Sequence, residues 1–252
     1  MTFVCLDAGN TRLKWGLVDE TAPGHAWLAR GALEWLRLAE LSVLLADALA
    51  QTPQATPLKH AFLGSVTSAT MERNLVRRLR GLPLTRLVAT TTAAGVANGY
   101  ADPECLGVDR WCALIGARAL EKRACLVVMA GTATTIDSLD ESGRFTGGLI
   151  LPGIELMRRA LNQGTARLPL AEGQYVPSPD NTRDAIATGC LDAQVGAIER
   201  AFRRSPHAGS CLLSGGAADM LSRHLRHLPV RMAPNLALEG MRHWALKLIG
   251  DA

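Results

Sequence analysis

Two signatures of common nucleotide-binding folds are missing from this sequence of 252 residues. It has no GxxxxGK[ST] P-loop and no GxGxxG turn, so neither P-loop nor dinucleotide chemistry is favoured. The histidines form no HExxH motif, and His224 and His227 have no third ligand beside them in the sequence. This pattern favours a solvated basic helix face over a metal site.

Cysteine pairs and long apolar runs are also missing. The six cysteines contain no CxxC pair and are too scattered for a disulfide framework, which predicts reduced, buried thiols. Asp7 interrupts the opening apolar run, so the first twenty residues resemble neither a secretory signal nor a membrane span. We therefore expect a cytoplasmic protein with no membrane partner.

The charge balance is only mildly basic. The net charge is +4, and the arginines are distributed along the faces of expected helices. A nucleic-acid footprint usually shows a stronger and more concentrated basic excess. Solvated helix surfaces are the favoured interpretation, and we do not expect a nucleic-acid partner.

Hydrophobic periodicity predicts alternating strands and helices, which favours a mixed α/β architecture. Strands are predicted near 2–6, 12–18, 59–65, 84–89, 124–129, 133–138, 144–150, 210–214 and 229–233. Helices are predicted near 36–50, 69–80, 107–122, 153–163, 182–204, 217–227 and 237–248. The polar stretch 172–184 is the best candidate for an exposed loop.

A repeat at half the chain length organises this pattern. Residues 4–20, VCLDAGNTRLKWGLVDE, align with residues 126–142, LVVMAGTATTIDSLDES. Each copy reads as a strand, an Ala-Gly turn and a second strand that ends in an acidic turn. The repeat predicts a duplicated domain, with ranges 1–115 and 116–252. Coincidence between two ordinary hairpins is the alternative.

The turn of the first hairpin, Asp7-Ala8-Gly9-Asn10-Thr11, has residues suited to phosphate. Gly9 lets backbone amides approach a ligand, and Asn10 and Thr11 offer short side-chain donors. Lys14 could reach a phosphate, and Asp7 could hold Mg²⁺, with several waters retained. A plain β-turn explains the same residues.

Two further glycine turns strengthen the phosphate hypothesis. Gly131 and Thr132 begin the equivalent turn of the second hairpin, and two such turns facing each other would grip a polyphosphate. Ser214-Gly215-Gly216 follows an apolar strand and opens a helical stretch, where an anion or a nucleotide edge is favoured. Tight strand-to-helix turns also need glycine for packing, so this last signal is weak alone.

The segment Gly107-Val108-Asp109-Arg110 begins an expected helix. Asp109 could accept a proton from a substrate hydroxyl while Arg110 fixes an anionic or carbonyl group. An aspartate placed near a helix N-terminus by the macrodipole is the alternative, and spacing alone favours it.

Six ordered motifs together resemble the type III pantothenate kinase family, of the actin-like and sugar-kinase ATPase superfamily. They are DAGNTRLKWG at 7–16, YADPECLGVDR at 100–110, AGTATTID at 130–137, GGLILPG at 147–153, NTRDAIATG at 181–189 and SGGAAD at 214–219. The resemblance implies two duplicated ribonuclease-H-like domains, with mixed sheets flanked by helices, in a homodimer. It also implies that ATP, with Mg²⁺, phosphorylates the 4′-hydroxyl of pantothenate, the first step towards coenzyme A.

The resemblance also implies a role for each matched residue. It makes Asp109 the general base. The implied ATP-binding residues are Asp7, Ala8, Gly9, Asn10, Thr11, Lys14, Gly131, Thr132, Ser214, Gly215 and Gly216. The implied pantothenate-binding residues are Tyr100, Gly107, Val108 and Arg110, with Thr182 contributed by the partner subunit.

The sequence departs from the family pattern at Met129. The family usually has an aspartate there, which helps to hold a monovalent cation such as K⁺ or NH₄⁺. A thioether is a poor ligand for a hard cation. We therefore expect an altered cation requirement, with Asp137 or backbone carbonyls as the compensating ligands.

Two other functions remain as alternatives at this stage. One is a kinase of the same superfamily with a different small-molecule acceptor. The other is a transcriptional accessory or regulatory protein, since proteins that resemble this family have been given that role.

Overall fold

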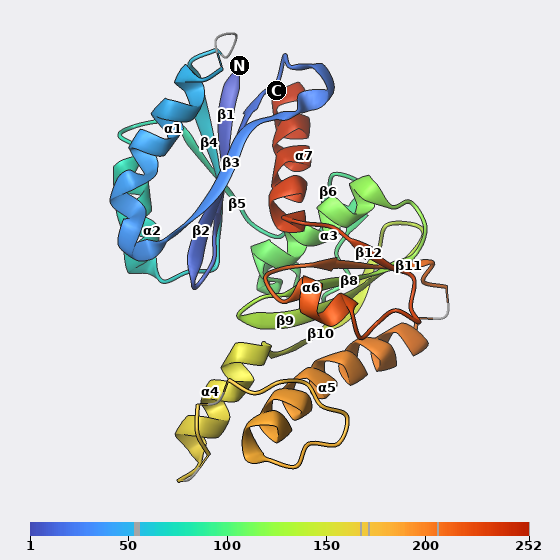
Figure 1. Cartoon of the computed structure of the whole chain (residues 1–252). Helices are drawn as coiled ribbons and strands as arrows, with labels where there is room; N and C mark the ends of the chain where they lie inside the picture. The colour runs from blue at the N-terminus through green and yellow to red at the C-terminus, as the bar shows by residue number, and fades with distance from the viewer. Residues whose placement is uncertain (53–55, 167, 171, 206, 252) are drawn as a thin grey trace. The chain divides into compact units, whose positions relative to one another are not determined.

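The computed structural model describes residues 1–52, 56–166, 168–170, 172–205 and 207–251 (Figure 1). The chain divides into two compact units, Met1–Leu120 with Leu236–Ala252 and Glu121–Asn235. No helix of the described residues is both long enough and apolar enough to cross a membrane.

The first unit contains a five-stranded mixed sheet in the order β3-β2-β1-β4-β5. Strands β1, β2 and β3 are antiparallel neighbours, and β4 and β5 continue the sheet parallel to β1. The strands are β1 (Thr2–Ala8), β2 (Arg12–Asp19), β3 (Trp27–Glu34), β4 (Leu58–Ser65) and β5 (Leu84–Leu87); β6 (Thr92–Ala93) and β7 (Val96–Ala97) form a separate ribbon.

The side chains of β1 alternate between the two faces of the first sheet, and different helices cover each face. Val4, Leu6 and Ala8 join a core that includes residues of α1 (Leu41–Ala50) and α2 (Ala69–Arg78). Asp7 belongs to the opposite face, because successive side chains of a strand point to opposite sides. Helices α3 (Val108–Leu120) and α7 (Leu236–Gly250) pack against each other and against strands on that side of the sheet (Figure 1).

The second unit repeats the topology of the first with the sheet order β10-β9-β8-β11-β12. Strands β8, β9 and β10 are antiparallel, and β11 and β12 are parallel to β8. Its elements are β8 (Cys125–Ala130), β9 (Ala133–Leu139), β10 (Phe145–Pro152), α4 (Ile154–Gly164), α5 (Thr182–Arg203), β11 (Ser210–Ser214), α6 (Ala218–Ser222) and β12 (Val230–Met232). The shared strand order supports a duplication, with one register difference. Ala8 pairs with Leu13, whereas Ala130 pairs with Thr134, so the second turn is one residue shorter.

The C-terminal helix α7 belongs to the first unit, which differs from the predicted ranges 1–115 and 116–252. Close packing explains the assignment. A Cβ atom on Gly240 would lie only 1.7 Å from the Cys112 carbonyl oxygen, so the backbones of α3 and α7 are in contact there. A sequence repeat compares segments in chain order and cannot show that the last helix returns to the first sheet.

Three local predictions differ from the structure. Strand β3 was not predicted, because its sequence WLARGALE is rich in alanine and glycine and lacks the β-branched residues typical of strands. The helix expected over 36–50 begins with the 3₁₀ turn η2 (Trp35–Glu40), and the helix expected over 217–227 contains only the five residues of α6. Five of the six free cysteines are buried as predicted, and the prediction is wrong for Cys105, which is exposed.

Candidate active site

The first hairpin places a carboxylate and an ammonium group side by side. Asp7 lies at the end of β1, opposite Lys14 on β2, and the Lys14 Nζ atom is 3.8 Å from Asp7 Oδ2. Asp7 is only 8% exposed, whereas Asn10 and Thr11 at the turn are exposed. The hairpin thus combines a buried negative group with a solvent-facing turn that carries short polar side chains.

Packing of β4 brings the start of α3 towards Asp7. Gly64 pairs with Asp7 in the sheet, and a Cβ atom on Gly64 would lie 3.5 Å from the Val108 side chain. Because Asp109 follows Val108, its carboxylate is close enough to act electrostatically on Asp7. Two acidic groups that are 102 positions apart in the chain therefore share one face of the first sheet.

The protonation of Asp7 reflects these surroundings. Burial raises the pKa of the Asp7 carboxyl to about 6, Lys14 opposes the rise, and the charge of Asp109 adds to it. A buried carboxylate with this pKa is costly to ionise and gains from a nearby cation. This is a property expected at a functional site as well as in a structural ion pair.

Arg110 is held in the interior of the first unit. It is 5% exposed, and its Nη1 atom donates a hydrogen bond of 2.7 Å to the Tyr100 hydroxyl. Tyr100 is in turn fixed by its own amide, which donates to Asn98 Oδ1. Arg110 is therefore a buried, hydrogen-bonded residue and not a solvated one.

Gly107 lies close to the carboxylate of Asp109. A Cβ atom at Gly107 would lie 2.7 Å from Asp109 Oδ1, which also accepts a hydrogen bond of 2.8 Å from the Arg110 amide. The Gly107 carbonyl accepts the first hydrogen bond of α3, from the Trp111 amide. The glycine thus allows the Asp109 side chain to fold over the start of the helix.

The second hairpin turn is enclosed by backbone from two other turns. Gly153 donates a 2.9 Å hydrogen bond to the Thr132 carbonyl, and a Cβ atom there would lie 2.2 Å from the Gly131 oxygen. Gly215, with φ of +105°, would place a Cβ atom 2.2 Å from the Ala130 oxygen. Only glycine permits these two approaches.

These close approaches predict that Gly153→Ala destabilises the second unit by about 2–3 kcal/mol, because the methyl group must displace backbone rather than a flexible side chain. Urea unfolding followed by circular dichroism measures the change. Gly189→Ala is the matched control, since a Cβ atom at this helical glycine meets nothing within 4 Å. The control should be more stable by about 1 kcal/mol. Equal midpoints for Gly153→Ala and the wild type would contradict the packing argument.

The remaining residues of the predicted site belong to the second unit. Ser214 ends β11 and is 1% exposed, and Gly216 is exposed just before α6. Thr182 is the exposed first residue of α5, directly after the N-cap Asn181, whose side chain accepts from the Asp184 amide.

Comparison with known sequences identifies the family. The sequence model of the type III pantothenate kinase family matches residues 3–204. The chain belongs to the type III pantothenate kinase family. The type III pantothenate kinase of Dechloromonas aromatica is 50% identical over 250 residues, which cover 97% of this chain and 99% of that protein. The type III pantothenate kinase of Aromatoleum aromaticum is 48% identical over 240 residues, or 94% of each chain.

Solved structures extend the likeness of this pantothenate kinase to a wider fold. A Campylobacter jejuni protein, described provisionally as a Baf family transcriptional activator, has a TM-score of 0.60 at 18% identity, with 99% of this chain and 100% of that one covered. The ethanolamine utilization protein EutJ from Carboxydothermus hydrogenoformans has a TM-score of 0.55 at 16% identity, with 98% and 89% covered. The predicted α/β architecture, with two mixed sheets flanked by helices, is confirmed.

Met129 lies on a polar face of the second sheet. Met129 pairs with Thr135, and Asp137 lies two residues further along the same strand. Since side chains two apart share a face, Met129, Thr135 and Asp137 lie on one side of the sheet. Asp137 is fully buried there.

Sequence reasoning found the hairpins and the start of α3 but missed the glycine that supports the second turn. Gly153 was included in the motif GGLILPG without a role. A Pro-Gly pair predicts a turn, and only the fold shows that this turn contacts residues 131 and 132.

Proposed function

We propose that this protein transfers the γ-phosphoryl group of ATP to the 4′-hydroxyl of pantothenate, the first step of coenzyme A synthesis. Family membership carries the identity of the reaction, and the juxtaposition of Asp7 with Asp109 carries the assignment of the site. One acidic residue belongs to the phosphate side, and the other to the acceptor side.

On the nucleotide side, we assign phosphate contacts to the turns of both hairpins. The exposed residues Asn10 and Thr11 and the ammonium of Lys14 support this assignment in the first unit. In the second unit, we assign Gly131 and Thr132 to the phosphates and the turn Ser214-Gly215-Gly216 to the adenosine. Ala8, at the end of β1, precedes the first turn.

On the acceptor side, Asp109 is the proposed general base. Arg110, the residue after Asp109, forms a hydrogen-bonded pair with Tyr100, which suits the pair to orient pantothenate. We assign Gly107 and Val108 to the same substrate. We assign Thr182 of the partner subunit to the same substrate.

The donor set of the first hairpin fits Mg²⁺. Asp7 supplies a single buried carboxylate, and Mg²⁺ is commonly held by one or two carboxylates together with substrate phosphates and water. When bound, the ion would neutralise charge on the β- and γ-phosphates. Lys14 would add a second positive charge, while Asp109 accepts the proton of the attacking hydroxyl.

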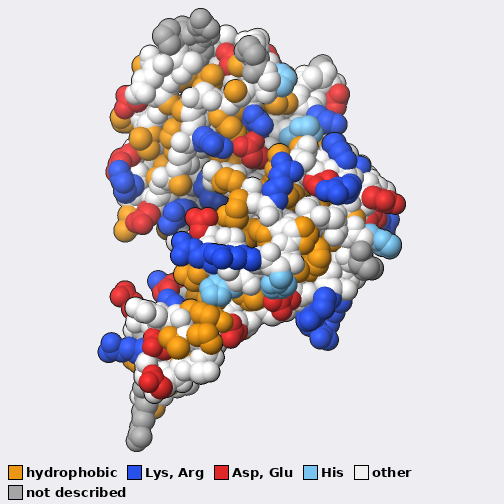
Figure 2. Space-filling view, turned by 45° about the vertical axis from the view of Figure 1, so that its right-hand side comes forward, with side chains coloured by type: hydrophobic (Ala, Val, Ile, Leu, Met, Phe, Trp, Pro, Cys, Tyr) orange, Lys and Arg blue, Asp and Glu red, His pale blue; other side chains and the backbone are white. Residues whose placement is uncertain are grey.

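We propose a cytoplasmic homodimer built on exposed apolar residues of β10 and α4 in the second unit. Strand β10 is at the edge of its sheet, and α4 follows it. The large apolar residues exposed on these two elements are Leu149 (40%), Ile150 (63%), Leu156 (43%) and Leu161 (36%). Figure 2 shows exposed hydrophobic side chains gathered at the height of α4 and α5 in Figure 1. Exposed apolar side chains beside an open sheet edge are typical of an oligomer interface.

A coupled assay with purified protein tests the reaction. ADP should form only when ATP and pantothenate are both present, and 4′-phosphopantothenate should form in equal amount. Turnover with another alcohol and none with pantothenate would contradict the acceptor. Salt-dependent DNA affinity without any turnover would instead favour a regulatory protein.

The cation requirement gives a separate prediction. Met129 offers no hard oxygen ligand, so the wild type should need a higher K⁺ concentration for half-maximal activity than Met129→Asp does. We expect the substitution to lower that concentration about tenfold, measured by varying KCl at constant ionic strength with a non-activating salt. Met129→Leu is the control, because it changes neither charge nor polarity. A strong, tight K⁺ requirement in the wild type would contradict this prediction.

A further inference from the structure

Trp35 contacts the first hairpin from outside it. Its indole Nε1 donates a hydrogen bond of 3.0 Å to the Gly9 carbonyl, across 26 positions of sequence. The Trp35 ring also packs against the core cluster beneath α1 and α2. The residue is therefore anchored on one side and bonded to the hairpin on the other.

The direction of this bond matters for the turn. A trans peptide is planar, so its carbonyl and its amide point in opposite directions. With the Gly9 carbonyl bound to Trp35, the amide of Asn10 is turned away from the indole. Because glycine is the least restricted residue of the chain, an external bond at Gly9 fixes a peptide that would otherwise rotate.

The second unit has a related contact at its own turn, where the accepting carbonyl lies one residue further along the repeat than Gly9 does in the first unit. Trp35 is the first residue after β3, and Gly153 is the first residue after β10, the equivalent edge strand. Gly153 donates its backbone amide to the Thr132 carbonyl at 2.9 Å. Each hairpin turn thus accepts a hydrogen bond from the residue that directly follows the third strand of its own sheet. One unit uses an indole and the other uses backbone.

We infer that Trp35 is a positioning residue for the phosphate-binding turn of this kinase. It fixes the Gly9–Asn10 peptide so that the turn is ordered before the nucleotide binds. The inference rests on the proposed function, because it requires the first hairpin to contact phosphate. Ordering before binding removes an entropic cost that a loose turn would pay with each ATP.

The test is Trp35→Phe, which keeps an aromatic ring and removes the donor. Loss of one hydrogen bond to a neutral carbonyl should raise the Kd for MgATP about fivefold, measured by isothermal titration calorimetry. The KM for pantothenate should not change. Amide exchange measured by mass spectrometry should be faster in the unliganded variant over residues 9–11.

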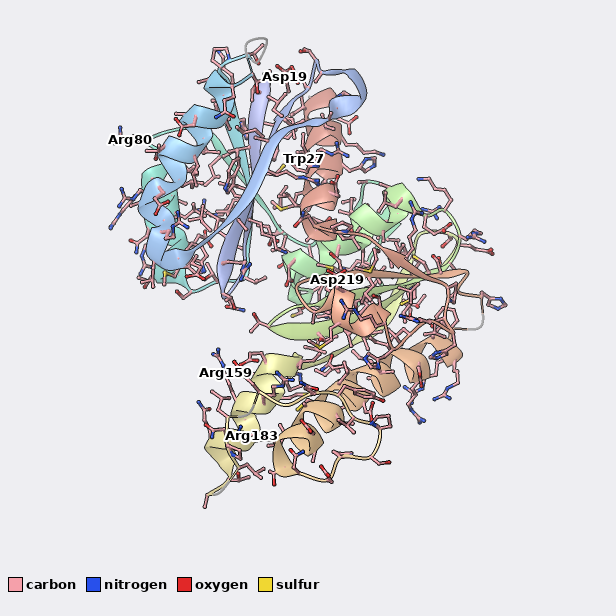
Figure 3. The ribbon with its side chains drawn as sticks, viewed as in Figure 1. Asp19, Trp27, Arg80, Arg159, Arg183 and Asp219 are labelled. Atoms are coloured by element: carbon pink, nitrogen blue, oxygen red, sulfur yellow. The ribbon has the colours of Figure 1, made fainter. Side chains whose placement is uncertain are left out.

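Trp27→Phe, at the first residue of β3, is the matched control. The Trp27 indole donates at 2.8 Å to Glu239 on α7, and Figure 3 shows the residue beside that helix. This variant also loses an indole donor but leaves the hairpin bond intact, so its Kd for MgATP should equal that of the wild type. Replacement of Trp35 by 3-benzothienylalanine, which keeps the bicyclic shape, covers the case in which Trp35→Phe does not fold.

Lys14→Met separates failure of the inference from failure of the proposed site. If Lys14→Met binds MgATP at least tenfold more weakly while both Trp35 variants bind it like the wild type, Trp35 only packs the core and the inference is wrong. If Lys14→Met binds MgATP as tightly as the wild type, the first hairpin is not the phosphate site, and the inference fails with it. Weaker binding by Lys14→Met and the Trp35 variants, with Trp27→Phe unchanged, supports it.

Discussion

Asp109→Asn is expected to lower kcat for pantothenate phosphorylation by about 10²–10⁴-fold, the usual contribution of a general base. The amide has the same shape as the carboxylate but cannot take the proton of the 4′-hydroxyl. Its oxygen can still accept the hydrogen bond that the Arg110 amide donates to Asp109 Oδ1. The fold should therefore persist, and the KM for ATP should change by less than about threefold. Single-turnover formation of 4′-phosphopantothenate, with both substrates saturating, measures the effect.

The free energy of unfolding of the same variant distinguishes two roles for Asp109, a general base and a charge that stabilises the N-terminus of α3. An aspartate that serves only the α3 macrodipole would cost about 0.3–1 kcal/mol of unfolding free energy when neutralised and would leave turnover unchanged. Asp47→Asn, at an exposed position of α1, is the matched control for removal of one negative charge. A variant enzyme with Asp109→Asn that keeps near-normal turnover would show that the base is another group.

The repeat predicted the topology well because each copy encodes its own hairpin. Alternating apolar residues fix the register of β1 with β2 and of β8 with β9, and the acidic turns Asp19-Glu20 and Asp140-Glu141 end both hairpins at equivalent places. These are local signals, so a sequence can carry them. The shorter second turn changes the alignment by one residue beyond the glycine.

Contacts between distant segments were the part that sequence could not supply. Gly240 on α7 and Cys112 on α3 pack backbone against backbone, and Gly153 does the same against the turn at residues 131 and 132. Glycine in a helix or after a proline has many explanations, and only the partner distinguishes among them. The bond from Trp35 to Gly9 is equally invisible, because nothing in the sequence marks an indole as a donor rather than as core.

The candidate catalytic residues were easier to predict from the sequence than their protonation. Asp7 and Asp109 were both singled out from their local sequence, but the proximity that couples them depends on the pairing of Gly64 with Asp7 and on the packing of Val108. The raised pKa of Asp7 follows from burial first and from Asp109 second. Burial of a single carboxylate at the end of a strand is a property of the assembled unit.

Asp7→Asn is expected to make the protein more stable at neutral pH while reducing turnover about 10²-fold or more, because the proposed Mg²⁺ ligand is removed. Burial gives Asp7 a pKa of about 6 in place of an ordinary value of 3.8. A difference of this size means that the ionised carboxylate costs about 3 kcal/mol in the folded state. Asparagine has the same size and carries no charge, so most of that cost should disappear. Lys14 keeps partial exposure to solvent and can be hydrated without its partner.

The difference in free energy of unfolding between the wild type and Asp7→Asn depends on pH. Because the folded pKa of Asp7 is raised, the folded state holds the proton more tightly than the unfolded chain does. The stability that the tightly held proton of Asp7 contributes is fully present below about pH 3.8 and is lost as the pH rises through about 6. Wild type and Asp7→Asn should therefore differ little in free energy of unfolding near pH 4. The variant should exceed the wild type by about 2–3 kcal/mol at pH 7.5.

Urea unfolding at a series of pH values measures the difference, and Lys14→Met provides the opposing control. Removing the ammonium leaves the Asp7 carboxylate without the charge that lowers its pKa, so Lys14→Met should be less stable than the wild type at pH 7.5. It should approach the wild type near pH 4, where Asp7 is protonated in both proteins. A result in which Asp7→Asn is the less stable protein at pH 7.5 would mean that the Lys14 ion pair outweighs the cost of burial. In that case the carboxylate would stabilise the hairpin, and a bound cation would not be needed to offset its charge.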